Sequence, residues 1–171
     1  MVKDEDRSWF EPLVRTLSHP ALKYAQILVL NTDVAQEIVQ EAFARVWASP
    51  KTPSREDEFR RWLYRVIANL ATDYHRHQAV GARLGLPSPP PEDPTRTVEE
   101  RDQRQALLEA VKRLNPKARQ AVYLRYFEDL SFAETARVLG LPQVTVRVTV
   151  HRALAKLRER LESRRTDEVP V

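Results

Sequence analysis

The chain has 171 residues, of which 42% are hydrophobic and 30% charged, and its formal net charge is +4 at pH 7. It contains no cysteine, which excludes disulfides, thiol chemistry and zinc sites built from cysteine. The charged N-terminus lacks a secretory signal pattern, and no apolar run approaches the roughly 18 residues that a membrane span needs. We therefore expect a cytoplasmic protein without membrane insertion, and the positive charge favours a polyanionic partner.

The sequence predicts an all-α protein made of two small helical bundles joined by a proline-rich linker. Only three glycines occur, and no long stretch alternates β-branched with polar residues. Residues 81–97 hold five prolines between Pro87 and Pro94, and each proline disfavours helix in the residue before it. We expect this segment to be an extended linker between an N-terminal domain, residues 1–80, and a C-terminal domain, residues 98–165.

The N-terminal domain is predicted to contain four helices. Ser8 and Glu11 have the spacing of a capping box at the start of the first helix, and a second helix is expected over about residues 20–30. A third begins near Thr32 and carries an apolar stripe at helical spacing. The fourth follows the loop 49–57 and has acidic residues around its first turn, where they suit the helix dipole.

The C-terminal domain is also predicted to contain four helices. They cover about residues 98–114, 116–127, 131–139 and 143–164. Ser131 and Glu134 form a capping-box pattern at the start of the third helix, and Gly140 opens a tight turn after it. A short helix, a tight turn and a longer helix form a helix-turn-helix, whose second helix enters the DNA major groove.

The last helix is predicted to have an inward and an outward face. The inward stripe contains Val146, Val150, Ala153, Leu154, Leu157 and Leu161. The outward side carries Val144, Val148, His151, Arg152 and Ala155, with Arg147 and Arg158 on its flank. Residues 143–165 hold seven Lys or Arg against two Glu, a local net charge of +5, which suits contacts to guanine and to phosphates. A solvated basic helix in a small bundle would show the same pattern.

Residues 130–161 resemble region 4 of the extracytoplasmic-function group of sigma-70 factors. That family shows a Leu-Ser-aromatic-x-Glu-x-Ala start, a Leu-Gly turn, and then Thr-Val-Arg and His-Arg-Ala. Here these are Leu130, Ser131, Phe132, Glu134, Ala136, Leu139, Gly140, Thr145, Val146, Arg147, His151, Arg152 and Ala153. The preceding stretch also fits the family, with Leu114, Pro116, Arg119, Leu124 and Arg125.

The N-terminal domain resembles region 2 of the same family. Residues 33–47 are similar to the helix that binds the RNA polymerase clamp, and Gln40 is the most specific match. Residues 59–76 look like the segment that faces promoter DNA, with Phe59, Trp62, Leu63, Asn69, Asp73 and Arg76 in the family's places. The resemblance implies a bacterial sigma factor, without enzymatic activity, that binds core RNA polymerase and directs it to promoters.

The resemblance also implies which residues make each contact. The −35 DNA would be contacted by Thr145, Arg147, Val148, His151 and Arg152. The −10 DNA would be contacted by Arg60, Arg61, Asn69, Asp73 and Arg76, with residues 48–58 as the pocket for an unstacked base. The polymerase clamp would be contacted by Asp33, Gln36, Glu37, Gln40 and Glu41, and the family also contacts the flap. Neither a cofactor nor a metal is expected, and the family commonly has an anti-sigma partner.

Several positions depart from the family pattern. Gln36 and Glu37 replace Glu-Asp, Val144 replaces Gly, and residues 148–149 are Val-Thr in place of Ser-Arg. Val148 has no hydrogen-bonding group, although it is able to contact a thymine methyl. Two valines on the expected DNA face indicate either an altered −35 preference or a contact with a protein.

Three aromatic residues of the fourth helix are candidates for stacking on exposed bases. Helical spacing favours core positions for Trp62 and Tyr74, whereas Tyr64 is expected at the surface. His75 and His77 lie two residues apart and do not share a helix face well, so a metal site is not expected there.

Two other classes of function are open on the sequence alone. A helix-turn-helix repressor or activator that works without polymerase would explain residues 130–161 but not the clamp-helix match. An adaptor that holds a protein partner and no longer reads DNA would explain the two valines. An enzyme is disfavoured, because the sequence shows no nucleophile-base set, phosphate loop or metal cluster.

Overall fold

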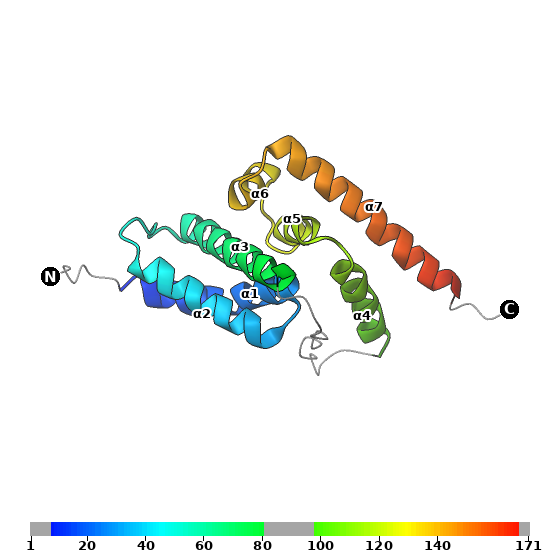
Figure 1. Ribbon diagram of the computed structural model, residues 1–171, viewed down its shortest axis with the longest axis horizontal. Coiled ribbons are helices and arrows are strands. Elements are labelled where there is room, and N and C mark those ends of the chain that lie inside the picture. The colour runs from blue at the N-terminus through cyan, green and yellow to red at the C-terminus, as the bar shows by residue number, and fades with distance from the viewer. Residues whose placement is uncertain (1–7, 81–97, 168–171) are drawn as a thin grey trace. The chain divides into compact units, whose positions relative to one another are not determined.

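The computed structural model describes residues 8–80 and 98–167, and the regular elements within these ranges are all α-helices (Figure 1). They form two compact units. The first unit contains α1 (Phe10–Val29), α2 (Thr32–Ala48) and α3 (Glu56–Val80). The second contains α4 (Val98–Lys112), α5 (Pro116–Tyr126), α6 (Phe132–Leu139) and α7 (Gln143–Asp167). The all-α prediction is confirmed, while the expected linker, residues 81–97, lies outside the described residues.

Helix α1 runs without a break through Pro20, where the sequence predicted two separate helices. Proline lacks the N–H that would bond the carbonyl of Thr16, and an interior proline costs a helix roughly 3 kcal/mol. The apolar stripe nevertheless continues on both sides, because Leu17, Ala21 and Tyr24 are all buried. Tertiary packing outweighs the proline, so the first unit has three helices within the described residues instead of the expected four.

Helix α1 begins at Phe10, and Trp9 at its N-cap has a helical backbone conformation and no capping hydrogen bond from its own side chain. The capping box of Ser8 and Glu11 stays a prediction. Glu11 forms an ion pair with Arg15 one turn later, at 2.7 Å between Oε1 and Nη2. This exposed pair contributes little to stability.

Helix α3 packs against both α1 and α2, and its buried arc is therefore wider than a single stripe. Tyr64, which was predicted at the surface, is 0% exposed. Its ring centroid lies 5.0 Å from that of Tyr24 in α1. Further along α3, His75 Nε2 lies 2.8 Å from the carbonyl oxygen of Leu28. The prediction that Tyr64 is available for stacking on a base is wrong, because two neighbouring helices cover that side of α3.

The second unit has the four predicted helices, although α4 ends at Lys112 and α7 continues to Asp167, where the sequence predicted ends near residues 114 and 164. Asn115 caps α5 by accepting a hydrogen bond from the backbone N–H of Ala118 at 2.9 Å. Ser131 Oγ accepts from the N–H of Glu134 at 3.1 Å, and the Glu134 carboxylate accepts from the N–H of Ser131 at 2.8 Å. Gly140 ends α6 in the left-handed region with φ 63°. The predicted capping box and turn of the helix-turn-helix are confirmed.

The core of the helix-turn-helix is a small apolar cluster between α5, α6 and α7. Ala121 of α5 and Ala136 of α6 are buried with Val146 and Val150 of α7. Around this cluster pack four partly buried hydrophobic side chains, which are Phe132, Leu139, Leu141 and Leu154. Because alanines occupy the α5 and α6 positions, the valines of α7 fill the space between the helices.

Arg119, one of the residues of the family motif, is buried in this unit. It is 4% exposed, and its Nη1 donates to the carbonyl oxygen of Lys112 at the end of α4, at 3.3 Å. Burial lowers the pKa of Arg119 below its usual value, because desolvation penalises the charged guanidinium. The side chain connects α5 to α4, so its place in the motif reflects folding of the unit.

We predict that Thr135→Val stabilises the second unit. Thr135 is fully buried, and its Oγ1 has no hydrogen-bond partner among the described residues. Valine has nearly the same shape and removes the buried hydroxyl, so the free energy of opening should rise by about 1 kcal/mol. The measurement is amide hydrogen exchange at Val146 and Val150. Thr145→Val, at an exposed position of α7, serves as the control, and an unchanged or lower value for Thr135→Val would contradict the prediction.

Candidate nucleic-acid interface

Helix α7 has the two faces that its sequence predicts. Val146, Val150, Ala153 and Leu157 are buried, and Leu154 and Leu161 are partly buried. The residues expected to meet −35 DNA are all exposed: Thr145, Arg147, Val148, His151 and Arg152. Val144 is exposed as well, at 72%. The side chains that a recognition helix needs for contact with DNA are therefore exposed on α7.

The turn between α6 and α7 determines where this face begins. After Gly140, the N–H of Leu141 bonds the carbonyl oxygen of Ala136 at 3.0 Å. The N–H of Val146 bonds the carbonyl oxygen of Pro142 at 3.1 Å, within the first turn of α7. The first bond closes the end of α6 and the second lies within α7, while burial of Val146 with Ala136 packs the N-terminal end of α7 against α6. This is the end whose residues meet base edges in helix-turn-helix proteins.

Two arginines meet at one aromatic ring at the start of α6. The Arg147 Cζ lies 5.0 Å from the ring centroid of Phe132, and the Arg125 Cζ lies 5.2 Å from the same centroid. Both distances are within the range of a cation–π interaction. Arg147 was expected in the site, whereas Arg125 was identified only as part of the motif. The approach of α5, α6 and α7 at Phe132 brings the two cations together.

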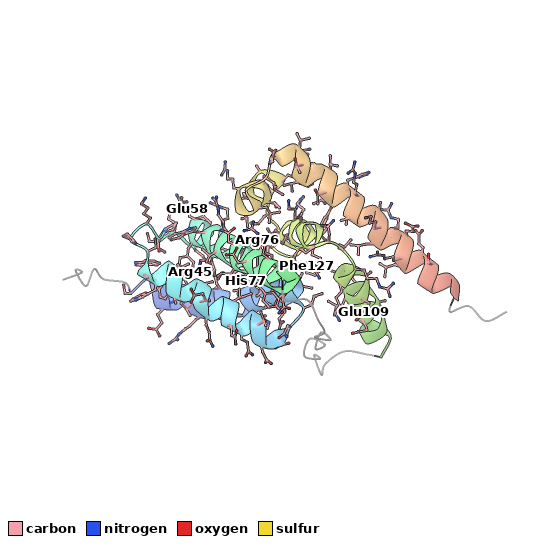
Figure 2. All side chains as sticks on the ribbon, viewed as in Figure 1. Arg45, Glu58, Arg76, His77, Glu109 and Phe127 are labelled. Atoms are coloured by element: carbon pink, nitrogen blue, oxygen red, sulfur yellow. The ribbon has the colours of Figure 1, made fainter. Side chains whose placement is uncertain are left out.

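The residues expected to meet −10 DNA lie on α3, but they do not all share one side. Asn69, Asp73 and Arg76 are exposed and spaced by three or four residues, so they follow one stripe of the helix. Arg76 Nη1 lies 3.6 Å from Asp73 Oδ1, and Figure 2 labels Arg76 on α3. Arg61 is partly buried, lies about 80° around the helix from Asn69, and contacts Asp57, with 3.3 Å between Nη2 and Oδ2.

Arg60 stands apart from this stripe. It precedes Asn69 by nine residues, which is about two and a half helical turns and places the two on opposite sides of α3. The Nε atom of Arg60 is buried. The aromatic candidates Trp62 and Tyr74 are partly buried, unlike the fully buried Tyr64. Trp62 lies about two helical turns before Asn69, on the same side of α3.

Helix α2 presents the polar face on which polymerase binding was expected. Asp33, Gln36, Glu37, Gln40 and Glu41 are all exposed. The opposite stripe is buried and consists of Ala35, Ile38, Val39, Ala42 and Val46. Glu41 pairs with Arg45 one turn later, at 2.7 Å between Oε1 and Nε, and Arg45 is labelled in Figure 2. The structure thus groups these five side chains on one accessible surface.

The loop after α2 is connected to the end of that helix by hydrogen bonds from Thr52. Thr52 Oγ1 donates to the carbonyl oxygens of Ser49, at 3.0 Å, and of Val46. Beside this loop, Trp47 is 46% exposed and packs on Phe10, with 4.8 Å between ring centroids. Sequence reasoning did not select Trp47, because its helical spacing matches the apolar stripe of α2.

The described residues show neither a metal-binding cluster nor a membrane-spanning helix. Within residues 8–80 and 98–167, no group of three or more His, Cys, Asp or Glu is arranged to hold a metal ion. The second histidine of the pair considered in the sequence, His77, bonds through Nδ1 to the carbonyl oxygen of Asp73 at 2.7 Å. Among the helices described, none is long and apolar enough to cross a membrane.

Comparisons with known proteins identify the family. The family model described as Sigma-70 region 2 matches residues 13–80, and the one described as Sigma-70, region 4 matches residues 104–157. The RNA polymerase sigma-E factor of Streptomyces coelicolor is 37% identical over 160 residues, covering 92% of this chain and 89% of that protein. The ECF RNA polymerase sigma factor SigW of Bacillus subtilis is 27% identical, covering 94% of this chain and 92% of that protein.

A solved structure supports the same fold. The sigma factor RpoE of Bartonella quintana, solved in complex with the anti-sigma factor NepR, matches with a TM-score of 0.73 and 20% sequence identity. The match covers 90% of this chain and 96% of that chain. The region 2 match spans α1–α3, and the region 4 match spans most of α4–α7. The chain therefore belongs to the extracytoplasmic-function group of the sigma-70 family, and it directs RNA polymerase to promoters in transcription initiation.

Proposed function

We propose that α7 reads the −35 element through Thr145, Arg147, Val148, His151 and Arg152. The observation that carries this proposal is the exposure of these side chains on α7 while the opposite stripe is buried. The local charge supports it, since residues 143–158 include Arg147, Arg152, Lys156 and Arg158 and no acidic residue. Arginines at such positions donate hydrogen bonds to guanine edges, which specify the sequence, or to phosphates, which position the helix in the groove.

We propose that α3 contacts the −10 element mainly through Arg61, Asn69, Asp73 and Arg76. Asn69, Asp73 and Arg76 lie on one exposed stripe of α3, and the partly buried Arg61 lies about 80° around the helix from Asn69. The ion pair between Asp73 and Arg76 orients both groups along that stripe. Arg60 remains part of the proposed set as a separate contact, because it points from another side of the helix.

We propose that the polar face of α2 binds the polymerase clamp through Asp33, Gln36, Glu37, Gln40 and Glu41. Exposure of all five residues supports this, together with the region 2 match that spans the helix. Gln40 is the residue with the best match to the family. A regulator that works without polymerase would have no need for this surface, so binding of core polymerase separates the two functions.

We further propose domain limits of 1–80 and 98–165 with a linker over 81–97, a cytoplasmic location, and no enzymatic activity of the chain itself. The two compact units and the family's role as initiation factors support these proposals. An anti-sigma factor is a further proposed partner, since RpoE of Bartonella quintana was solved with one. A purified candidate inhibitor that fails to compete with core polymerase for this chain would exclude that partner.

We predict that Gln40→Arg weakens binding of the full chain to core polymerase at least tenfold, or about 1.4 kcal/mol. A longer, charged side chain at the centre of the α2 face would disrupt close packing against the clamp without touching the buried stripe. Gln78→Arg, an exposed change on α3, is the matched control. Fluorescence anisotropy of labelled chain with core polymerase measures both, and equal affinities for the two variants would reject the α2 assignment.

We predict that Asn69→Ala and Arg147→Ala separate the two DNA contacts. On promoter duplexes with a scrambled −35 element, Arg147→Ala should cause no further loss of holoenzyme binding. On duplexes with a scrambled −10 element, Arg147→Ala should still weaken holoenzyme binding about tenfold, as expected for the loss of one good base contact. Asn69→Ala should show the reverse pattern.

The control is Arg15→Ala, which removes an exposed arginine of α1. Mobility-shift titrations with holoenzyme measure all of these affinities. If Arg147→Ala loses the same factor on both scrambled duplexes, the −35 assignment of α7 fails. If Asn69→Ala does so, the −10 assignment of α3 fails.

A further inference from the structure

Two valines form an apolar crest on the outward side of α7. Val144 is 72% exposed and Val148 is 42% exposed, and they lie one helical turn apart. Val146 and Val150, two residues to either side of Val148, are buried. Two residues correspond to about 200° of helical rotation, so Val148 points away from the core. We call Val144 and Val148 the valine crest.

Cations border this crest along one side and at its C-terminal end. Arg147 precedes Val148 by one residue and reaches the ring of Phe132 on α6, which draws its guanidinium toward that flank. Arg152 follows Val148 by four residues, one helical turn, so it is exposed in line with the crest at its C-terminal end. The sequence from Gln143 to Arg158 contains no Asp or Glu. An apolar crest in cationic surroundings fits a polyanion that carries apolar groups, because a protein surface covering it would have to desolvate these arginines.

We propose that the valine crest recognises thymine methyl groups in the major groove of the −35 element. The proposal rests on the −35 role proposed for α7. Among the base edges in the major groove, the thymine C5-methyl is the apolar group, and valine offers no hydrogen bond to the others. The crest thus makes Val144 and Val148 specificity-determining residues that favour A·T pairs at the positions they meet.

The geometry limits where those thymines lie. The Cα atoms of Val144 and Val148 are about 6 Å apart along the axis, from a rise of 1.5 Å per residue. Successive base pairs rise about 3.4 Å, so the crest spans about two base-pair steps. The −35 element should therefore contain thymines within a window of about three adjacent base pairs, next to the base pairs that Arg147 and Arg152 contact.

The test replaces each thymine of the −35 element by deoxyuridine, which removes only the methyl group. The element is first defined by selecting DNA that the holoenzyme binds from a pool randomised at −35. At a position that faces the crest, one such replacement should weaken holoenzyme binding about fourfold, the effect of one buried methyl. Replacement in the spacer is the control. A selected element without any A·T pair would overturn the proposal.

The variants Val144→Ala and Val148→Ala connect the effect to the crest. Both positions are exposed, so the helix should fold normally. In each variant, the preference for thymine over deoxyuridine should disappear at the position that the missing side chain faces. An unchanged preference in both variants would overturn the proposal.

The variant Arg147→Ala tests the −35 role of α7 separately from the role of the valine crest. If Arg147→Ala weakens −35-dependent binding while deoxyuridine has no effect, the crest proposal fails and the −35 role stands. If neither change affects binding, the −35 role fails and the crest proposal fails with it. If the alanine variants weaken binding to a protein partner and leave the thymine preference unchanged, the crest is a protein contact and the proposal is overturned.

Discussion

The packing of Val146 and Val150 against Ala121 and Ala136 is the interaction on which the DNA-facing part of the second unit depends. It fixes the rotation of α7 about its own axis, and rotation decides which side chains reach solvent. A turn of about 100° would move Val148 toward the core and a buried residue outward. The capping box at Ser131 and the left-handed Gly140 keep α6 and α7 in the positions that this packing requires. The exposure of Arg147 and Arg152 follows from burial on the opposite side of the helix.

In the first unit, too, burial of one face of each helix in the core leaves the opposite face exposed. Burial of the stripe that includes Ile38, Ala42 and Val46 leaves the polar face of α2 free, and burial of α3 against two helices leaves the stripe of Asn69 and Arg76 free. Each unit therefore sets its own contact surface locally. A substitution in the core of one unit should change the contact surface of that unit, because each unit is compact by itself.

Local signals in the sequence predicted the second unit well, since caps and turns depend on a few neighbouring residues. The Ser131 box, the Gly140 turn and the inward stripe of α7 were all predicted and confirmed. The errors, at Pro20 and Tyr64, arose where packing between helices overrides a local preference. The meeting of Arg125 and Arg147 at Phe132 depends on three helices and has no local signal. Helical spacing alone predicts that Arg60 and Asn69 lie on opposite sides of α3. The roles of the site residues came from the family resemblance and stay predictions.

As a sigma factor, this chain gives core polymerase a promoter preference of its own. The most direct measurement maps transcript 5′ ends made by bacterial core RNA polymerase, with and without the full chain, on a library of random upstream sequences. We predict that the chain concentrates initiation at a fixed distance downstream of two shared sequence elements. A distribution of 5′ ends that is the same with and without the chain would contradict it.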